Sequence, residues 1–236
     1  MSAHEIVSAQ AWRDARKALL AEEKEFTRLR DRMSEKRRAL PWTRVEKAYR
    51  FDAPDGRKTL SDLFEGRGQL IVQHIMFAPE SSAPCKSCSF WADHHDATLP
   101  HLHARDVALV GVSRAPLEKL RSVAARLGWK FPWVSDLDGF NHDFQTSFTP
   151  EELAAGPVEY NYRVGAVRSP DLPGYSVFVR DGGEVFHTYS CYARGLDMLN
   201  PTYHLLDLVP KGRDENPENP MSWVRLHDKY DAPAGR

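Results

Sequence analysis

The spacing of hydrophobic residues predicts one long helix at the start of the chain. Residues 7–39 contain neither glycine nor proline. Large apolar side chains recur every seven residues, at Trp12, Leu19, Phe26, Met33 and Leu40. A stripe this narrow is typical of a helix that packs on one side only, either on the chain's own domain or on a partner helix. Between residues 11 and 50, Lys and Arg outnumber Asp and Glu by 13 to 7, so this segment is basic.

From residue 41 onward, strand and helix patterns alternate. Unbroken apolar runs are typical of strands buried on both faces of a sheet, and Asp55-Gly56 is a favoured hairpin turn. The expected strands are 48–51, 59–60, 69–77, 107–112, 133–135, 175–180 and 185–189, and the expected helices are 85–96, 117–127 and 192–208. This β-α-β-α-β half followed by β-β-α predicts an α/β domain, a central mixed sheet flanked by helices.

These patterns predict three regions. Residues 1–40 form an N-terminal amphipathic helical arm, residues 41–212 form the α/β domain, and residues 213–236 form a loosely attached C-terminal tail. Within the domain, residues 136–172 are less regular. We expect them to form a lid-like insertion before the strand that begins at Pro173.

Composition excludes several classes of protein. The 236 residues are 42% hydrophobic and carry a net charge of −1, which argues against broad binding to nucleic acid or to an anionic membrane. No segment approaches the ~20 consecutive apolar residues of a membrane-spanning helix. The first residues lack the pattern of a signal peptide, and three cysteines are too few for a disulfide scaffold. We therefore expect a soluble cytoplasmic protein.

The strongest chemical signal is the pair Cys85 and Cys88 in the sequence Cys-Lys-Ser-Cys. The pair follows a predicted buried strand and a short loop and begins a predicted helix. A helix N-terminus stabilises a thiolate, and Lys86 would add positive charge beside it. Cys85 is therefore the expected nucleophile, with Cys88 one turn further on to close a disulfide. Such a dithiol needs no cofactor.

Histidines near the cysteines leave a metal site open as the main alternative. Two thiolates with an imidazole from His95 or His101 would suit copper(I) or zinc. If the cysteine pair is not redox-active, it could instead form half of a structural zinc site.

Two other residues are candidates for supporting or lining the site. His74 interrupts a buried apolar run together with Gln73, so one of the two either relays a proton to Cys88 or is simply a satisfied polar group of the core. Trp91 is a candidate wall of an apolar substrate groove, with core packing as the alternative.

The chain as a whole resembles a bacterial thioredoxin-like family catalogued as a domain of unknown function. The resemblance covers about residues 18–215 and is carried by the stretches 38–42, 60–64, 85–93, 101–107, 112–116, 128–129, 186–190 and 192–195. It implies a thioredoxin-like fold without a settled activity. Cys191, where the family pattern has Thr, and the turn at 136–139 depart from it.

A thioredoxin-like fold also implies a role for Pro173. In such proteins a proline, usually cis, begins the strand that faces the cysteine pair and presents backbone to the substrate. We therefore expect Pro173 to contact substrate, preceded by a cis peptide bond.

Three functions remain open at this stage. The leading hypothesis is a thiol–disulfide oxidoreductase acting on a protein or small-molecule disulfide. The others are a copper or zinc protein using Cys85, Cys88 and a histidine, and a non-catalytic binding module. A peroxiredoxin motif starting at Pro79 would need Ser or Thr at Ala83 and Cys at Lys86, so peroxidase activity of that kind is not expected. The arm predicts a possible homodimer contact.

Overall fold

A computed structural model describes residues 4–167 and 169–230, and the chain divides into two units after Trp42. The first unit consists mainly of α1 (Ala9–Arg38), whose N-terminus is capped by the Ser8 side chain. No residue of α1 is buried, and its apolar stripe is exposed, with Trp12 at 59% and Phe26 at 62%. Among the described residues, no helix combines the length and apolar character that crossing a bilayer requires.

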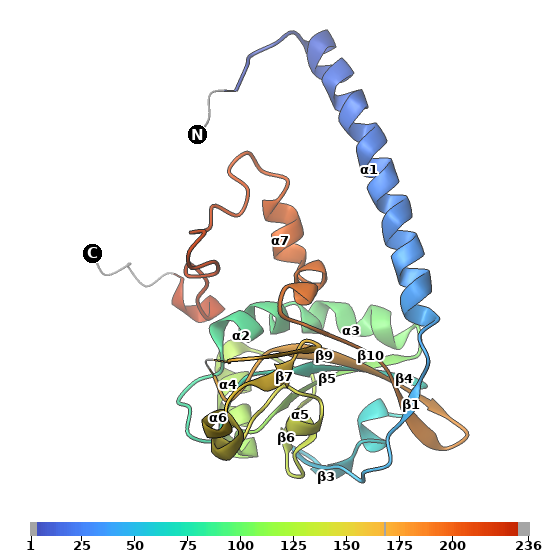
Figure 1. The fold of residues 1–236 in the computed structure, drawn as a ribbon, viewed down its shortest axis with the longest axis vertical. Coiled ribbons are helices and arrows are strands. Elements are labelled where there is room, and N and C mark those ends of the chain that lie inside the picture. The colour runs from blue at the N-terminus through green and yellow to red at the C-terminus, as the bar shows by residue number, and fades with distance from the viewer. Residues whose placement is uncertain (1–3, 168, 231–236) are drawn as a thin grey trace. The chain divides into compact units, whose positions relative to one another are not determined.

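The second unit is built on a mixed sheet of eight strands within the described residues (Figure 1). Its strands are β1 (Thr43–Arg44), β2 (Arg50–Ala53), β3 (Gly56–Thr59), β4 (Gln69–His74), β5 (Val107–Ser113), β6 (Trp133–Asp136), β9 (Gly174–Asp181) and β10 (Glu184–Tyr192). The order across the sheet is β1-β10-β9-β4-β5-β6-β2-β3, and β7 (Val158–Tyr160) pairs separately with β8 (Arg163–Gly165).

Six short helices and three 3-10 turns belong to the same unit. The helices are α2 (Lys86–Ala92), α3 (His95–His103), α4 (Leu117–Leu127), α5 (Phe140–Asp143), α6 (Pro150–Ala155) and α7 (Pro201–Leu206). The 3-10 segments are Asp62–Phe64, Ala193–Leu199 and His227–Lys229. Figure 1 shows α2 and α3 along one face of the sheet, with α5 on the opposite side.

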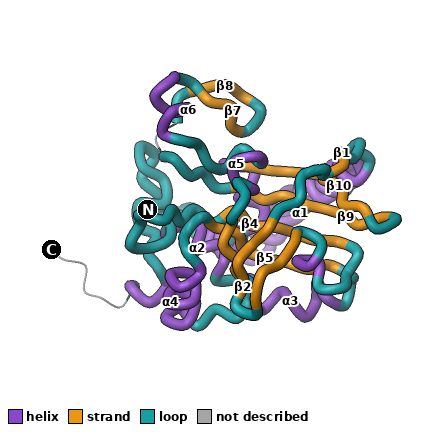
Figure 2. Tube along the Cα trace, turned by 90° about the horizontal axis from the view of Figure 1, so that it is seen from below, coloured by secondary structure: helices purple, strands orange, loops and turns teal. Residues whose placement is uncertain are grey.

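The strand order identifies the fold. β4 is parallel to β5 on one side and antiparallel to β9 on the other, and β9 pairs antiparallel with β10. A β-α-β unit joined to a β-hairpin in the order β10-β9-β4-β5 is the thioredoxin-like arrangement, here extended by β6, β2, β3 and β1. The predicted fold class is confirmed, and Figure 2 shows β4 and β5 in the middle of the sheet.

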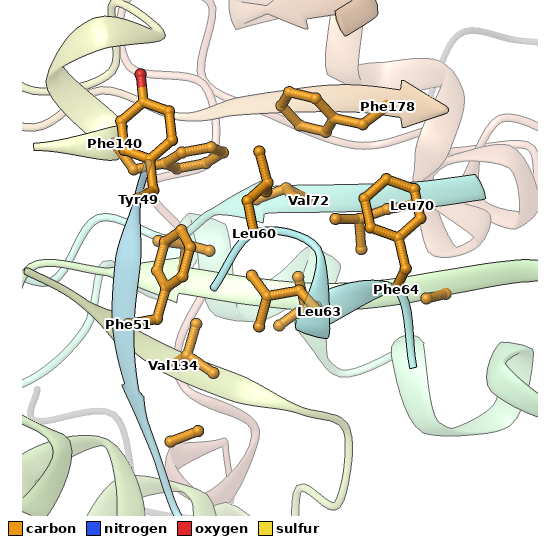
Figure 3. Close-up of a cluster of buried hydrophobic side chains, with 14 residues drawn as sticks. Tyr49, Phe51, Leu60, Leu63, Phe64, Leu70, Val72, Val134, Phe140 and Phe178 are labelled. Carbon is orange, nitrogen blue, oxygen red and sulfur yellow. The ribbon is translucent and has the colours of Figure 1, made fainter. Parts of the chain in front are cut away.

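Successive side chains of β4 point to opposite faces of the sheet, so the hydrophobic core has one layer on each face. Leu70 and Val72 point to the side that holds Phe64 and Phe178, and Figure 3 shows these side chains gathered there. On the other side, Ile71 packs against the cluster that holds Phe90 of α2, and Ile75, just after the strand, belongs to the cluster that holds α4. Burying a large apolar side chain contributes about 1.5–3 kcal/mol, so both layers hold β4 and the loop that follows it in place.

Several predicted elements end differently in the structure. The segment predicted as one helix over 85–96 is two helices, α2 and α3, with Asp93 and His94 between them. The helix predicted over 192–208 is wrong in its first half, where β10 ends and a 3-10 segment follows. Asn200 caps α7, since its side chain accepts hydrogen bonds from the N–H groups of Thr202 and Tyr203, and Pro201 occupies the first helical position.

The C-terminal segment, residues 213–230, is not loosely attached. Trp223 packs edge-on against Phe90 of α2 with ring centroids 5.5 Å apart, and Val224 is fully buried. His227 lies 2.6 Å from the Asp93 carboxylate, and Arg126 of α4 pairs with Asp228. These contacts depend on residues distant in sequence, which is why the polar composition of the tail did not predict them.

Candidate functional site

The loop after β4 places Cys85 at the beginning of α2. The Cys85 N–H donates to the Met76 carbonyl at 2.9 Å, which ties the loop to the end of the strand. The Cys85 carbonyl accepts from both the N–H and the hydroxyl of Ser89, at 3.0 Å each. Cys85 is partly exposed and Cys88 is buried, and both are free thiols. The pair therefore presents one accessible sulfur and one inaccessible sulfur.

Hydrogen bonds give the two thiols different acidities. The Cys88 thiol, the N–H groups of Cys88 and Ser87, and the Ser87 hydroxyl all donate to the Cys85 sulfur; against the opposing effect of burial, they lower the pKa of Cys85 to about 6. The Cys85 thiolate, together with burial, raises the pKa of Cys88 well above its ordinary value. At neutral pH, Cys85 is a thiolate and Cys88 is its proton-bearing neighbour.

Lys86 does not contribute the charge expected of it. Its ammonium donates to the Ser222 carbonyl at 3.1 Å, in the C-terminal segment. Two of the hydrogen bonds that lower the pKa of Cys85 come from backbone N–H groups in the first turn of α2, as expected of a helix N-terminus, and the Cys88 thiol contributes the largest effect. Lys86 instead ties α2 to the C-terminal segment.

The polar group that reaches the cysteine pair is Gln73, not His74. The Gln73 amide donates to the Cys88 carbonyl at 3.0 Å, and the His95 ring lies 2.6 Å from the Gln73 amide oxygen. His74 also borders the site, but its ring nitrogens contact Asn141 and Ser176, each at 2.8 Å. Burial lowers the pKa of His74 to about 4 and that of His95 to about 3, so both rings are neutral. No hydrogen bond from His74 to Cys88 supports a proton relay between them.

The metal ligands proposed from the sequence do not converge. His95 is directed to Gln73, and His101 is exposed on α3. In the part of the chain that the structure describes, no group of three or more His, Cys, Asp or Glu side chains is arranged to hold a metal ion. Cys191, the third cysteine, is buried on β10 opposite Tyr175 of β9.

A pocket of about 420 Å³ lies over the cysteine pair. Its lining includes Cys85, Cys88, Trp91, Pro173 and His74, so these candidates from the sequence border one cavity. Trp91 also belongs to the core, since it is 7% exposed and its indole N–H donates to the Leu196 carbonyl at 2.9 Å. This volume is within the range of roughly 300–1,000 Å³ that is usual for small-molecule sites.

Pro173 is at the expected place but not in the expected conformation. It precedes β9 and borders the pocket, whereas its peptide bond with Leu172 is trans, so the expectation of a cis bond is wrong. The trans form is the intrinsically preferred one, and it satisfies the local polar groups. The Leu172 N–H donates to the Thr146 carbonyl at 2.9 Å, and the Pro173 carbonyl accepts from the Tyr160 hydroxyl at 2.7 Å.

The wall opposite the cysteines was missed by sequence reasoning. Glu215, Pro220 and Met221 of the C-terminal segment line the pocket, together with Tyr203 and Arg213. Among the described residues of 136–172 none lines the pocket, whereas residues of the C-terminal segment do. The sequence contains no motif in this segment that could have indicated it.

The strand order and the cysteine pair after β4 define a thioredoxin-like protein. The chain belongs to the family described as bacterial protein of unknown function, DUF899, whose model matches residues 1–230. No curated protein matches the sequence.

Several solved structures are similar to this chain at low identity. Peroxidoxin BcpB from Mycobacterium tuberculosis is 16% identical with a TM-score of 0.47, over 69% of this chain and 95% of the other. A mutant of peroxiredoxin Q from Xanthomonas campestris is 15% identical with a TM-score of 0.47, over 71% and 97%. A proposed protein disulfide isomerase from Bacteroides thetaiotaomicron is 18% identical with a TM-score of 0.41, over 70% and 91%.

Proposed function

We propose that this protein is a thiol–disulfide oxidoreductase that uses Cys85 and Cys88. The observation that carries the proposal is the division of roles within one pocket, where a partly exposed thiol with a pKa of about 6 accepts a hydrogen bond from a buried thiol with a raised pKa. This is the asymmetry that dithiol exchange requires, since the attacking sulfur must be a thiolate and the second must act later.

The reaction has two balanced steps. The Cys85 thiolate attacks one sulfur of the substrate disulfide, forms a mixed disulfide and releases the other half as a thiolate. Cys88 then transfers its proton to the thiolate released in the first step, attacks the Cys85 sulfur and releases the second half of the substrate as a thiolate. Two electrons pass from the protein to the substrate, and a separate thiol reductant must return the Cys85–Cys88 disulfide to the dithiol. In the reducing cytoplasm, where we propose that the protein acts, reduction of substrate is the favoured direction.

Trapping the mixed disulfide tests this mechanism. The variant Cys88→Ser retains the Cys85 nucleophile but lacks the thiol that resolves the mixed disulfide. After mixing with a disulfide, we expect half of the substrate to remain bound to Cys85 as a stable adduct, which peptide mass detects. Cys85→Ser should form no adduct, and Cys191→Ser should behave like the wild type. An equal yield of adduct in Cys85→Ser would contradict the assignment of Cys85 as nucleophile.

For α1 we propose contact with the same helix of a second copy. The exposed side chains Trp12, Leu19 and Phe26 follow a seven-residue spacing, which is the repeat of helices that pack along a seam. Phe26→Glu should convert a dimer to a monomer in light scattering, whereas Thr27→Glu, one position away from the stripe, should not. A wild-type monomer at high concentration would refute the contact.

A further inference from the structure

The pocket over the cysteine pair is enclosed by a segment that follows the last helix of the domain. Four residues of the segment 213–221 line the cavity that Cys85 and Cys88 border, namely Arg213, Glu215, Pro220 and Met221. Access to the exposed sulfur is therefore limited by the C-terminal segment as well as by the loop after β4. Figure 1 shows this part of the chain on the same side of the sheet as α2.

Glu215 holds the segment in place. One oxygen of its carboxylate accepts three hydrogen bonds, from the Tyr203 hydroxyl at 2.9 Å, the Trp223 indole N–H at 2.9 Å and the Met221 N–H at 3.0 Å. Tyr203 is buried and lines the pocket. Through these hydrogen bonds, Glu215 joins Tyr203 to Met221 and Trp223 further along the C-terminal segment. Lys86 adds a fourth connection, from α2 to the Ser222 carbonyl.

The interior of the pocket favours apolar ligand groups. Its lining is mainly apolar and includes Trp91, Pro173, Tyr175, Leu196 and Met221. The arginines at its border are already paired with carboxylates, and Glu215 is held by the three hydrogen bonds above. Arg194 contacts Asp197 at 2.9 Å, and Arg213 contacts Asp197 at 3.1 Å and Asp207 at 2.8 Å. A charged group that enters the apolar interior leaves water without gaining a partner there, which is costly.

We propose that the site accepts compact, uncharged disulfides of low molecular mass and that the C-terminal segment excludes the disulfides of folded proteins. This inference rests on the disulfide exchange proposed above and specifies its substrate class. A cavity of about 420 Å³ has room for a small disulfide but not for a loop of a folded protein. Charged peptides such as glutathione disulfide are disfavoured because the arginines at the border of the pocket are already paired with carboxylates.

Single-turnover oxidation of the reduced protein tests the substrate class. The reduced chain is mixed with 2-hydroxyethyl disulfide, glutathione disulfide or insulin, and loss of free thiol on the Cys85 peptide is followed by quenched alkylation. Dithiothreitol, treated in the same way, supplies the intrinsic reactivity of each disulfide. Relative to dithiothreitol, we expect the protein to prefer 2-hydroxyethyl disulfide over insulin by at least about tenfold, which corresponds to ~1.4 kcal/mol.

Glu215→Ala tests the part played by the C-terminal segment. Loss of the shared acceptor should raise the rate with insulin by about tenfold, again ~1.4 kcal/mol, while the rate with 2-hydroxyethyl disulfide stays the same or falls. Glu218→Ala is the matched control, because Glu218 is exposed on the same segment and does not line the pocket. A second readout needs no redox chemistry: a bulky polyethylene-glycol maleimide should label Cys85 in Glu215→Ala faster than in the wild type, with iodoacetamide as the small reagent.

The outcomes separate this inference from the function on which it rests. If no disulfide oxidises the pair, disulfide exchange itself is wrong and the substrate class fails with it. If disulfides do oxidise the pair, but the wild type ranks them as dithiothreitol does, exchange stands and selection by the C-terminal segment is refuted. That comparison uses only the wild-type chain, so it holds even if Glu215→Ala does not fold.

Discussion

At the scale of single residues, the chemistry of the site depends on which sulfur receives hydrogen bonds. Cys85 accepts them from Cys88 and from Ser87, whereas Cys88 is buried beside the resulting negative charge. The sequence identified both cysteines and their order of action. It also identified the N-terminus of α2 as a source of acidity for Cys85, but not the hydrogen bond from the Cys88 thiol, and the Lys86 ammonium expected to add charge donates to the Ser222 carbonyl.

The acidity of Cys85 predicts its pH profile. Because the pKa of Cys85 is lowered to about 6, its rate of alkylation by iodoacetamide should rise through pH 6 and level off near neutrality. A thiol with the ordinary pKa of about 8.5 would still be gaining reactivity at pH 8.

Replacing Cys88 tests the cause of that acidity. Cys88→Ala removes the hydrogen bond that lowers the pKa of Cys85 most. The midpoint of the alkylation rate against pH should therefore rise by about one pH unit, as expected for a hydrogen bond to a charged group. Cys88→Ser retains a hydroxyl donor and should shift the midpoint less. Equal midpoints in both variants and the wild type would contradict a hydrogen bond between the two thiols.

Gln73 is predicted to hold α2 and α3 against β4. Its buried amide joins the Cys88 carbonyl to the His95 ring, so Gln73→Leu leaves buried polar groups without a partner and should reduce the free energy of unfolding by about 1–3 kcal/mol. Denaturant unfolding measures this. Gln69→Leu, at the exposed start of the same strand, should change stability by less than about 0.5 kcal/mol, and a similar loss in both variants would refute the role of Gln73.

At the scale of helices and strands, the sequence predicted those elements whose position depends on interactions between residues close together in the chain. The buried runs of β4 and β5 and the Gly128 end of α4 lie where the sequence places them, because apolar periodicity and helix capping act over a few residues. The expected hairpin also forms, but its turn is Pro54-Asp55, one residue earlier than expected, and Gly56 pairs with Ala53. The segment 192–208, predicted as one helix, is interrupted by Gly195 and Asn200-Pro201, and Asn200 caps a new helix. Pairing with β9 also keeps Cys191 and Tyr192 in β10, which is a long-range contact that composition does not report.

The start of β9 gives a prediction at this scale. Gly174 borders the pocket, and an added Cβ would lie 2.8 Å from both Thr146 Cγ2 and Tyr192 Cδ1. Gly174→Ala should therefore destabilise the fold by about 1–3 kcal/mol through overpacking, read from denaturant unfolding. Gly165→Ala in β8 meets no atom within 4 Å and is the matched control. A fully stable Gly174→Ala would contradict the close approach of β9 and β10 at this point.

At the scale of the whole molecule, the part that could not be predicted is the one that closes the site. The position of the cysteine pair follows from its place after a buried strand, since the carboxyl end of β4 must lie at the edge of the sheet. The arrival of residues 213–224 over that edge depends on tertiary contacts, such as those of Glu215 with Tyr203 and of Trp223 with Phe90. The pocket is thus the product of two segments about 130 residues apart, of which only the first carries a motif.

The most direct test of the central claim is the redox equilibrium of the cysteine pair. The wild-type protein is equilibrated in graded glutathione buffers, free thiols are trapped by alkylation, and the state of Cys85 and Cys88 is read by peptide mass. We predict one reversible two-electron transition, with a potential in the range of roughly −270 to −120 mV found for thioredoxin-family catalysts. A pair that stays reduced in every buffer, or that becomes available to alkylation only after chelation, would contradict dithiol–disulfide exchange.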